Sequence, residues 1–286
     1  MGYKHFGRIG DIWKHFPLCE IVSNEIIETY IETNSGYFDY ELGHSEEQDY
    51  GIGWFIKKSQ NVTELENSQY FKIIKPFYDT DMYLGSCGQV IHIIRNKAKK
   101  YIFFDLDKDA LISIERAVNE LGISHKVETR QMDSATGLIN LIPELNQKAF
   151  VHIDPYLIHQ PNNDGYSYLD GFFEALKRGV KSFLWYGFRT LKEKREINDI
   201  LIVRTDQTRT KKISCDELII KEIQEDSINI NPGVLGCGIL TSNLNIKSIG
   251  IISDSAKVLV EMYRDSKYKG VNGELYHDKI INNFAT

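Results

Sequence analysis

The sequence feature that most constrains the fold is an alternation of short apolar runs with helical patterns between residues 87 and 186. The apolar runs are rich in β-branched and aromatic residues and have the length of buried strands. Strands separated by helices at this spacing are typical of βαβ units, which build a parallel sheet with right-handed crossovers. We expect strands at 101–105, 126–130, 150–153 and 181–186, and helices at 87–98, 108–121, 135–142 and 166–178.

Both ends of the chain add to this α/β pattern. Residues 9–24 predict a helix with a kink or a fresh start at Pro17, and residues 26–33 predict a strand. Near the other end, an antiparallel strand pair joined by a loop at 231–233 would extend a parallel sheet into a mixed one. The elements expected there are strands at 215–223 and 236–242 and a last helix at 253–267.

Residues 37–83 interrupt the alternation with an aromatic and acidic segment. It contains a helical pattern at 68–75, which Pro76 is expected to stop. Aromatic residues such as Trp54 and Phe71 need a surface to pack on, so we expect an inserted subdomain rather than a linker. A small core is the more typical use of such a cluster, and a base-stacking platform is the alternative.

The amino-acid composition limits the class of protein but does not identify a function. The 286 residues are 42% hydrophobic and 26% charged, as in ordinary globular domains. No apolar stretch approaches the roughly 20 residues of a membrane span, and residues 1–8 lack a signal-peptide core, so we expect a cytoplasmic protein. Neither the four scattered cysteines nor the eight histidines show metal-ligand spacing, so no metal site is predicted. The net charge of −6 counts against a nonspecific nucleic-acid binder, although a local basic surface could still serve one.

Polar groups follow four of the predicted strands, where a parallel sheet would gather them at one edge. They are the segment 33–36, Asp105, Asp133 and Asp154. A carboxylate such as Asp105 suits the two hydroxyls of a ribose, and Asp133 could accept a hydrogen bond from the amino group of adenine. Each could equally be a solvated strand end or a helix N-cap. Together they indicate an adenosine-containing cofactor.

The stretch Asp154-Pro155-Tyr156 ends the apolar run at 149–153 abruptly, because proline cannot continue a strand ladder. A carboxylate, a rigid carbonyl and an aromatic face at that point could grip a planar base that carries an amino group. Alone, the same three residues are more typical of a strand cap and turn.

The turn at Gly36 limits the choice of cofactor. It holds one glycine, and Asp105 follows far beyond the roughly 20 residues that a dinucleotide-binding fingerprint requires. NAD and FAD need a pyrophosphate cradle, which this turn lacks. S-adenosylmethionine has no phosphate and stays compatible.

Taken along its length, the sequence resembles the bacterial 23S ribosomal RNA adenine-N6 methyltransferases, once described as external-DNA utilisation or competence proteins. The resemblance covers about residues 3–264, and its motifs keep the family's order. In this chain the motifs are Tyr3-Lys4-His5, the segments 7–15 and 30–36, Tyr83-Leu84-Gly85-Ser86, Phe104-Asp105-Leu106, Ile153-Asp154-Pro155-Tyr156, Leu184-Trp185-Tyr186 and the segment 237–243.

The resemblance implies one domain, residues 1–286, with a Rossmann-like class I methyltransferase sheet and a small inserted helical subdomain at about 44–82. It implies S-adenosyl-L-methionine as cofactor and RNA as partner. Asp154, Pro155 and Tyr156 would act on the target adenine, whose base must leave its stack, and Tyr3 and His5 would contact the substrate. The cofactor would be bound by Lys14, Asn34, Gly36, Ser86, Asp105, Asp133 and Asp154.

One motif departs from the family, which has Asp-Pro-Pro-Tyr where this chain has Asp154-Pro155-Tyr156-Leu157. Either Tyr156 reaches the stacking position through a shorter loop, or stacking is lost. Three functions therefore stay open: an RNA adenine methyltransferase, a DNA adenine methyltransferase, and a methyltransferase fold that binds nucleic acid without catalysis. We expect a monomer that does not enter a membrane.

Overall fold

The computed structural model describes residues 6–60, 62–208, 212–220, 234–268 and 270–284. Its centre is an eight-stranded sheet in the order β12-β8-β9-β7-β6-β1-β4-β5. The strands from β5 to β7 are parallel, and β9, β8 and β12 each pair antiparallel with their neighbour. The strands are β1 (Thr29–Thr33), β2 (Asp39–Glu41), β3 (Met82–Leu84), β4 (Lys100–Asp105), β5 (Val127–Gln131), β6 (Ala149–Ile153), β7 (Lys181–Phe188), β8 (Lys212–Ile220), β9 (Gly236–Ser242), β10 (Lys267–Tyr268), β11 (Val271–Asn272) and β12 (Leu275–Phe284).

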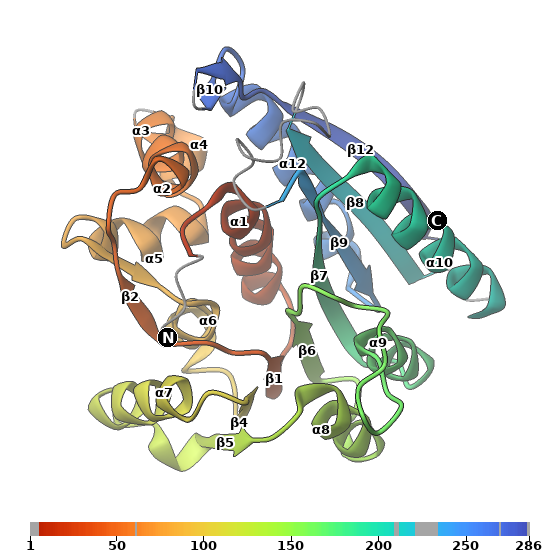
Figure 1. The fold of residues 1–286 in the computed structure, drawn as a ribbon. Helices are drawn as coiled ribbons and strands as arrows, with labels where there is room; N and C mark the ends of the chain where they lie inside the picture. The colour runs from red at the N-terminus through yellow and green to blue at the C-terminus, as the bar shows by residue number, and fades with distance from the viewer. Residues whose placement is uncertain (1–5, 61, 209–211, 221–233, 269, 285–286) are drawn as a thin grey trace.

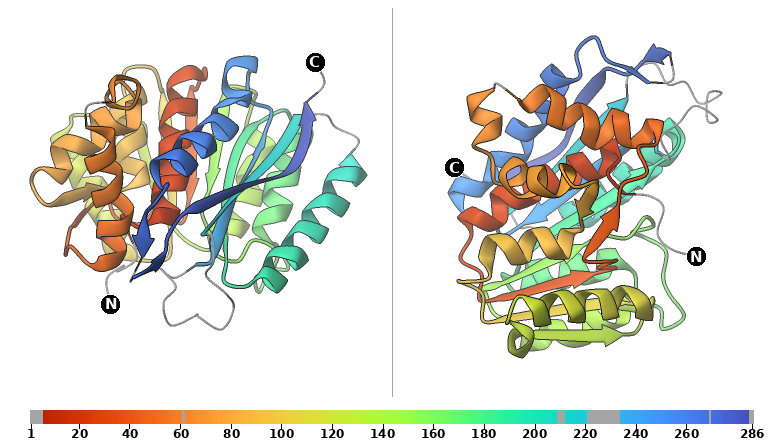
Figure 2. Two further views of the ribbon diagram at one scale, coloured as in Figure 1. Left: turned by 90° about the horizontal axis from the view of Figure 1, so that it is seen from above. Right: turned by 90° about the vertical axis from the view of Figure 1, so that its left-hand side faces the viewer.

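Helices cover both faces of the sheet (Figures 1 and 2): α1, α6, α7 and α12 lie on one face and α8, α9 and α10 on the other. Side-chain oxygens of Asp107, Asp133 and Ser167 cap the first turns of α7, α8 and α9. The helices are α1 (Ile9–Asn24), α2 (Glu46–Gln48), α3 (Trp54–Ser59), α4 (Thr63–Glu66), α5 (Gln69–Tyr78), α6 (Ser86–Ile94), α7 (Lys108–Glu120), α8 (Ser134–Leu141), α9 (Tyr168–Lys177), α10 (Leu191–Thr208), α11 (Ile246–Ile249) and α12 (Ile251–Met262), with single turns η1 (Asp49–Gly53), η2 (Ser124–Lys126) and η3 (Ile142–Glu144).

The predicted Rossmann-like sheet with a terminal antiparallel hairpin is confirmed, since β8 and β9 pair as expected. The chain leaves β1 for β4 on one side and β6 lies on the other, so the strand order reverses between β1 and β6. Ligands of open α/β sheets bind outside the carboxyl ends of the strands at such a reversal. The predicted loop at 231–233 lies outside the described residues.

Several predicted boundaries are wrong. Helix α5 continues past Pro76 to Tyr78. The predicted helix at 9–24 is confirmed as α1, and of the two alternatives at Pro17 the fresh start does not occur. Each proline removes one backbone hydrogen bond, which the packing of the helix offsets. Strand β1 begins only at Thr29, and α12 ends at Met262. Helix α10 and strand β12 were not predicted.

Between residues 44 and 82 the described residues form short helices, from α2 to α5, that share a core with the rest of the chain. Helix α5 packs on α1 and α6. Phe16 of α1 contacts the rings of Phe55 and Tyr70, with centroids 5.5 and 6.2 Å away. The aromatic residues of this segment therefore pack into a core.

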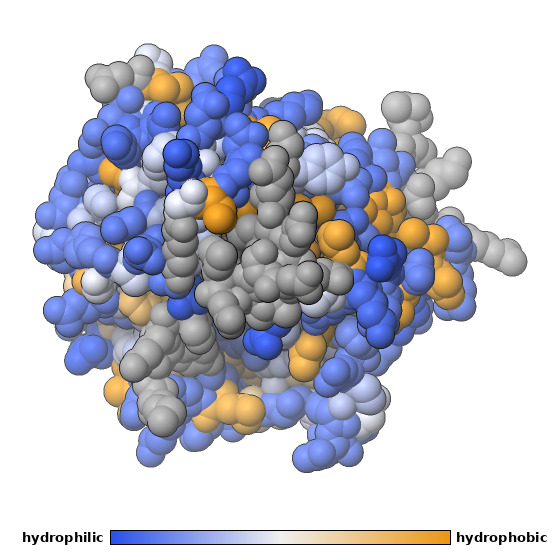
Figure 3. Space-filling view, turned by 45° about the horizontal axis from the view of Figure 1, so that its top comes forward, coloured by the Kyte–Doolittle hydropathy of each residue, from blue (hydrophilic) through white to orange (hydrophobic). Residues whose placement is uncertain are grey.

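The surface is mostly polar where it is coloured in Figure 3, and apolar side chains gather there only in small groups. Within the described ranges, no helix is both long and apolar enough to cross a membrane.

Candidate functional site

Strand β6 ends at the point where the sheet order reverses. Its five residues are all buried, and Pro155 prevents the ladder from going further. Asp154 follows directly, and its backbone N–H donates to Oγ1 of Thr33, the last residue of β1, at 3.2 Å. The neighbouring strand thus fixes the position of the carboxylate at the sheet edge.

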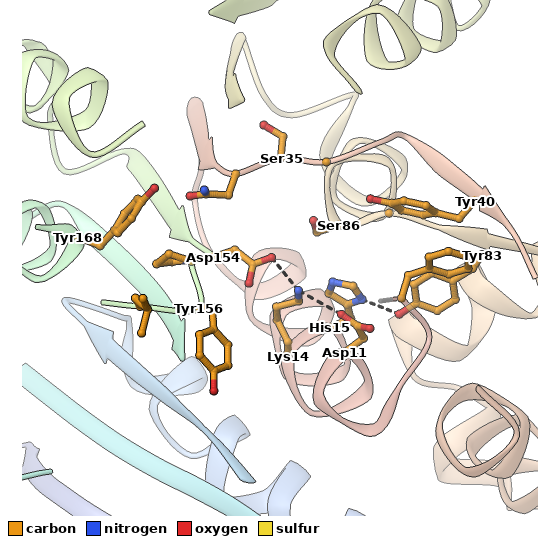
Figure 4. A pocket seen from close by; sticks show the side chains of 16 residues that line it. Asp11, Lys14, His15, Ser35, Tyr40, Tyr83, Ser86, Asp154, Tyr156 and Tyr168 are labelled. Atoms are coloured by element: carbon orange, nitrogen blue, oxygen red, sulfur yellow. Dashed lines mark hydrogen bonds and ion pairs between the residues drawn. The ribbon is translucent and has the colours of Figure 1, made fainter. Parts of the chain in front are cut away.

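Lys14 of α1 connects this strand end to the helix above it (Figure 4). Its Nζ lies 2.7 Å from Asp154 Oδ2 and 3.3 Å from Asp11 Oδ1. Burial opposes the charge on Lys14, but Asp154 and Asp11 outweigh that effect, and the pKa of Lys14 is raised. Burial also raises the pKa of Asp154, although Lys14 beside it acts in the opposite direction. The result is one ammonium shared by two carboxylates.

The turn after β1 has no spare amide for an anion. Asn34 and Gly36 have left-handed backbones, with φ of 56° and 62°. Four consecutive N–H groups then donate within the chain: Ser35 to Phe104 O (3.0 Å), Gly36 to Asp105 Oδ2 (2.9 Å), Tyr37 to Tyr40 Oη (2.9 Å) and Phe38 to Ser113 Oγ (3.0 Å). A phosphate site needs such N–H groups free. The turn is therefore not a phosphate cradle.

A cavity of about 430 Å³ opens at this edge of the sheet. Seven of the predicted site residues line it: Lys14, Asn34, Gly36, Ser86, Asp154, Pro155 and Tyr156. Figure 4 shows Tyr156 and Tyr168 on the Asp154 side and Tyr40 and Tyr83 across from them. The volume and the aromatic walls suit a planar heterocycle of nucleoside size.

Two predicted residues, Asp105 and Asp133, do not line the cavity. Asp105 is buried and accepts N–H bonds from Gly36 and from Asp107, at 2.9 and 2.8 Å. Asp133 caps α8 through Thr136 N and also accepts from the side-chain amide of Asn162. Both carboxylates thus hold the backbone or a loop. The predicted substrate contacts Tyr3 and His5 lie outside the described residues.

Ser86 begins α6, and its hydroxyl donates to the fully buried carboxylate of Glu32. Glu32 also accepts from Tyr30 Oη at 2.9 Å and lies 3.3 Å from Nδ1 of His152, its register partner on β6. Several partners are needed because an unpaired buried carboxylate is costly. The network links the strand that carries Asp154 to the helix that carries Ser86.

Sequence reasoning missed several residues of the cavity wall. Phe6 stacks on Tyr40, with ring centroids 4.5 Å apart, and a 2.7 Å hydrogen bond joins His15 Nδ1 to Tyr83 Oη. Asp11 could have been found from its i, i+3 spacing to Lys14. Tyr83 belongs to a motif that resembles the family's. Phe6, Tyr40 and Tyr168 have no local signal, since only the tertiary fold brings them to the cavity.

The fold and cavity together define an α/β protein with a site at the strand-order reversal. No protein-family model and no curated protein matches the chain. Protein LPL1258 from Legionella pneumophila str. Philadelphia 1, of family model DUF519, is similar over 96% of this chain and 98% of its own, with 19% identity and a TM-score of 0.72. That similarity shows a common fold over nearly the whole chain.

Two other solved structures are less similar. One is an rRNA methylase from Streptococcus thermophilus, with 13% identity, 81% of this chain and 94% of that chain covered, and a TM-score of 0.41. The other is the N-methyltransferase NodS from Bradyrhizobium japonicum WM9 in complex with S-adenosyl-L-homocysteine, with 7% identity, coverage of 84% and 90%, and a TM-score of 0.40. At these TM-scores neither carries an argument about this chain.

Proposed function

We propose that the protein is an S-adenosylmethionine-dependent adenine-N6 methyltransferase that acts on RNA, and on 23S ribosomal RNA in particular. The observation that carries the proposal is the Asp154 carboxylate at the end of β6, paired with Lys14 and lining a cavity of nucleoside size. The order of the sequence motifs, which resembles that of the RNA adenine-N6 methyltransferases, gives independent support.

The residues present fit S-adenosylmethionine better than a dinucleotide, because the turn at Gly36 offers no free amide to a phosphate. When bound, the cofactor supplies a methyl group activated by its sulfonium charge. Lys14, Asn34, Gly36, Ser86 and Asp154 would hold it from the cavity wall. For Asp105 and Asp133, which do not line the cavity, a contact with the cofactor is proposed from the sequence resemblance alone.

In this proposal, Asp154 prepares the target amino group. The lone pair of the adenine amino nitrogen is delocalised into the ring, which makes that nitrogen a poor nucleophile. Lys14 binds Oδ2 of Asp154, and among the described residues nothing donates to Oδ1. Oδ1 and the Pro155 carbonyl would accept the amino hydrogens and localise the lone pair, and Tyr156 would pack against the base.

The remaining assignments are proposals of the same kind. Tyr3 and His5 contact the RNA, residues 44–82 form an inserted subdomain, and the protein acts as a cytoplasmic monomer. The sequence resemblance supports the first two, and for the third, the cavity wall is built from described residues of a single copy of the chain.

A second candidate is a protein of this fold that binds nucleic acid without catalysis. It is favoured by the Lys14–Asp154 pair, which at 2.7 Å occupies one carboxylate oxygen as a purely structural ion pair would. Methylation of DNA adenine is the near alternative within the enzyme class.

The test is methyl transfer from labelled S-adenosylmethionine to deproteinised ribosomal RNA and to duplex DNA, with N6-methyladenine measured by mass spectrometry of the digests. We expect label in the RNA digest. Label in DNA alone would move the substrate to DNA. Binding of the cofactor and of RNA without methyl transfer to either substrate would favour the noncatalytic candidate.

A further inference from the structure

Arg189 lies just outside the cavity, at the end of the strand next to β6. It follows β7 directly and is exposed. Its guanidinium carbon is 5.2 Å from the ring centroid of Tyr156, which lines the cavity. Its backbone N–H donates to the carboxylate of Glu193 in the first turn of α10, at 2.6 Å. Contacts of its backbone and of its guanidinium thus both hold Arg189 in place.

Tyr156 reaches this position because residue 187 has no side chain. A Cβ at Gly187 would lie 3.0 Å from Cε2 of Tyr156 and 2.9 Å from Cγ1 of Val234. Such contacts are closer than neighbouring side chains tolerate. Gly187 therefore allows the Tyr156 ring to lie against β7, with the guanidinium over it.

The two cationic side chains at the cavity, Lys14 and Arg189, differ in their carboxylate partners. The ammonium of Lys14 is shared by Asp11 and Asp154. Among the residues that the structure describes, no carboxylate pairs with the Arg189 guanidinium, and Glu193 uses its carboxylate for the backbone N–H of Arg189. A planar guanidinium with free donors is the side chain best suited to a phosphate, and it stacks on aromatic rings while doing so.

We propose that Arg189 binds the phosphodiester next to the target base, so that the site takes a nucleotide within a polynucleotide rather than a free nucleoside. This inference rests on the proposed function. A base drawn into the cavity leaves its charged backbone outside, where Arg189 stands beside the ring that would receive the base. Tyr156 then contacts the base, and Arg189 contacts the phosphate. This arrangement also accounts for the position of the Arg189 guanidinium over the Tyr156 ring.

The experiment compares the unmodified full-length protein with Arg189→Gln, Arg189→Lys and a matched control, Arg264→Gln. Arg264 is another exposed arginine, paired with Glu261 and absent from the cavity wall. Binding of a short single-stranded oligoribonucleotide with one central adenosine is measured by fluorescence anisotropy over a salt series, with S-adenosylhomocysteine present. Binding of S-adenosylhomocysteine and of free adenosine is measured by calorimetry.

For Arg189→Gln we expect about tenfold weaker oligonucleotide binding at low salt, because one charge-assisted hydrogen-bonded contact is lost. The slope of log affinity against log salt should fall by about 0.7, the share of one phosphate contact in a single strand. Arg189→Lys keeps the slope, Arg264→Gln changes nothing, and the affinity for free adenosine and for S-adenosylhomocysteine is unchanged in all variants.

The contradicting outcomes separate the two proposals. An unchanged salt slope in Arg189→Gln, with normal cofactor binding, overturns the role of Arg189 alone. An equal loss of affinity for free adenosine also overturns it, since that loss would come from stacking and not from a phosphate. Failure of the unmodified protein to bind S-adenosylhomocysteine overturns the proposed function itself.

Discussion

Asp154 after β6 and Asp105 at the end of β4 stand at the same edge of the sheet, but the chain uses them differently. Asp105 accepts two backbone N–H groups, from Gly36 and Asp107, and does not line the cavity. Asp154 is bonded at its carboxylate by a side chain, Lys14, and lines the cavity. A side chain can rotate away, whereas a backbone amide cannot leave without opening the turn. In the proposed function, Asp154 is therefore the carboxylate that acts on the substrate, whereas Asp105 holds the turn.

The largest effect should come from Asp154→Ala, which removes the acceptor at the cavity. We expect methyl transfer to fall by on the order of 10²–10³-fold or more, as when a group that acts in the transition state is deleted. Initial rates on deproteinised ribosomal RNA give the measurement, with a thermal unfolding curve to show that the variant folds. A near-normal rate would mean that the strand end is only a cap.

Lys14→Met should destabilise the fold by about 3 kcal/mol, because it leaves two largely buried carboxylates, those of Asp11 and Asp154, without their cation. Since folding raises the pKa of Lys14, its contribution is fully present below the ordinary lysine pKa of about 10 and is lost as the pH rises through the raised value. Urea unfolding as a function of pH should therefore show a constant difference from the unmodified protein near neutrality, shrinking only at strongly alkaline pH.

The same substitution should change the pH dependence of the reaction. Activity requires the Asp154 carboxylate and falls as the pH drops through its raised pKa. Without the opposing ammonium that pKa rises further, so the acid limb of the pH–rate profile should move to higher pH in Lys14→Met. If the acid limb does not move in Lys14→Met, the group whose protonation lowers the rate is not Asp154.

Asp105→Ala should affect stability more than chemistry. Loss of both backbone hydrogen bonds is expected to lower the free energy of unfolding by about 2 kcal/mol. Asp105→Asn keeps one acceptor oxygen and should cost about half as much. Urea denaturation of both variants tests this, and an unchanged midpoint for Asp105→Ala would remove the contrast with Asp154.

The smallest effect is expected for Tyr156→Phe. The hydroxyl of Tyr156 is buried and has no hydrogen-bond partner among the described residues. Its removal should change the free energy of unfolding by less than about 1 kcal/mol and the transfer rate by no more than about twofold. Tyr156→Ala, which removes the ring, should weaken binding of an adenosine-containing oligonucleotide by about 1–3 kcal/mol if the base stacks there. Equal behaviour of the two variants would show that the ring is not a stacking surface.

The sheet could be predicted because its central strands are continuous buried runs and its helices are amphipathic. Helix α10 was not predicted because its sequence is rich in charged and other polar residues and only four of its side chains are buried. Strand β12 mixes polar and apolar residues such as Tyr276 and His277, which gives no clear pattern at the sheet edge. The predicted end of helix α5 at Pro76 is wrong because tertiary packing stabilises the helix beyond the proline.

The site was predictable to the extent that strand ends meet at one edge of a parallel sheet. That rule predicted that Asp154 and the Asn34–Gly36 turn lie at one edge of the sheet, and both line the cavity there. It could not tell which carboxylate faces the cavity, because this depends on partners such as Gly36 N–H and Asn162 that come from distant segments. The aromatic wall of Phe6, Tyr40 and Tyr168 depends on the same long-range packing.

The most direct test of the central claim is a calorimetric titration of the protein with S-adenosylhomocysteine and, separately, with NAD. The claim is that this edge of the sheet holds a phosphate-free adenosine cofactor beside Asp154. It predicts saturable binding of S-adenosylhomocysteine, weakened in Lys14→Met, and no heat of binding with NAD. Absence of S-adenosylhomocysteine binding at millimolar ligand, or binding of NAD in its place, would contradict it.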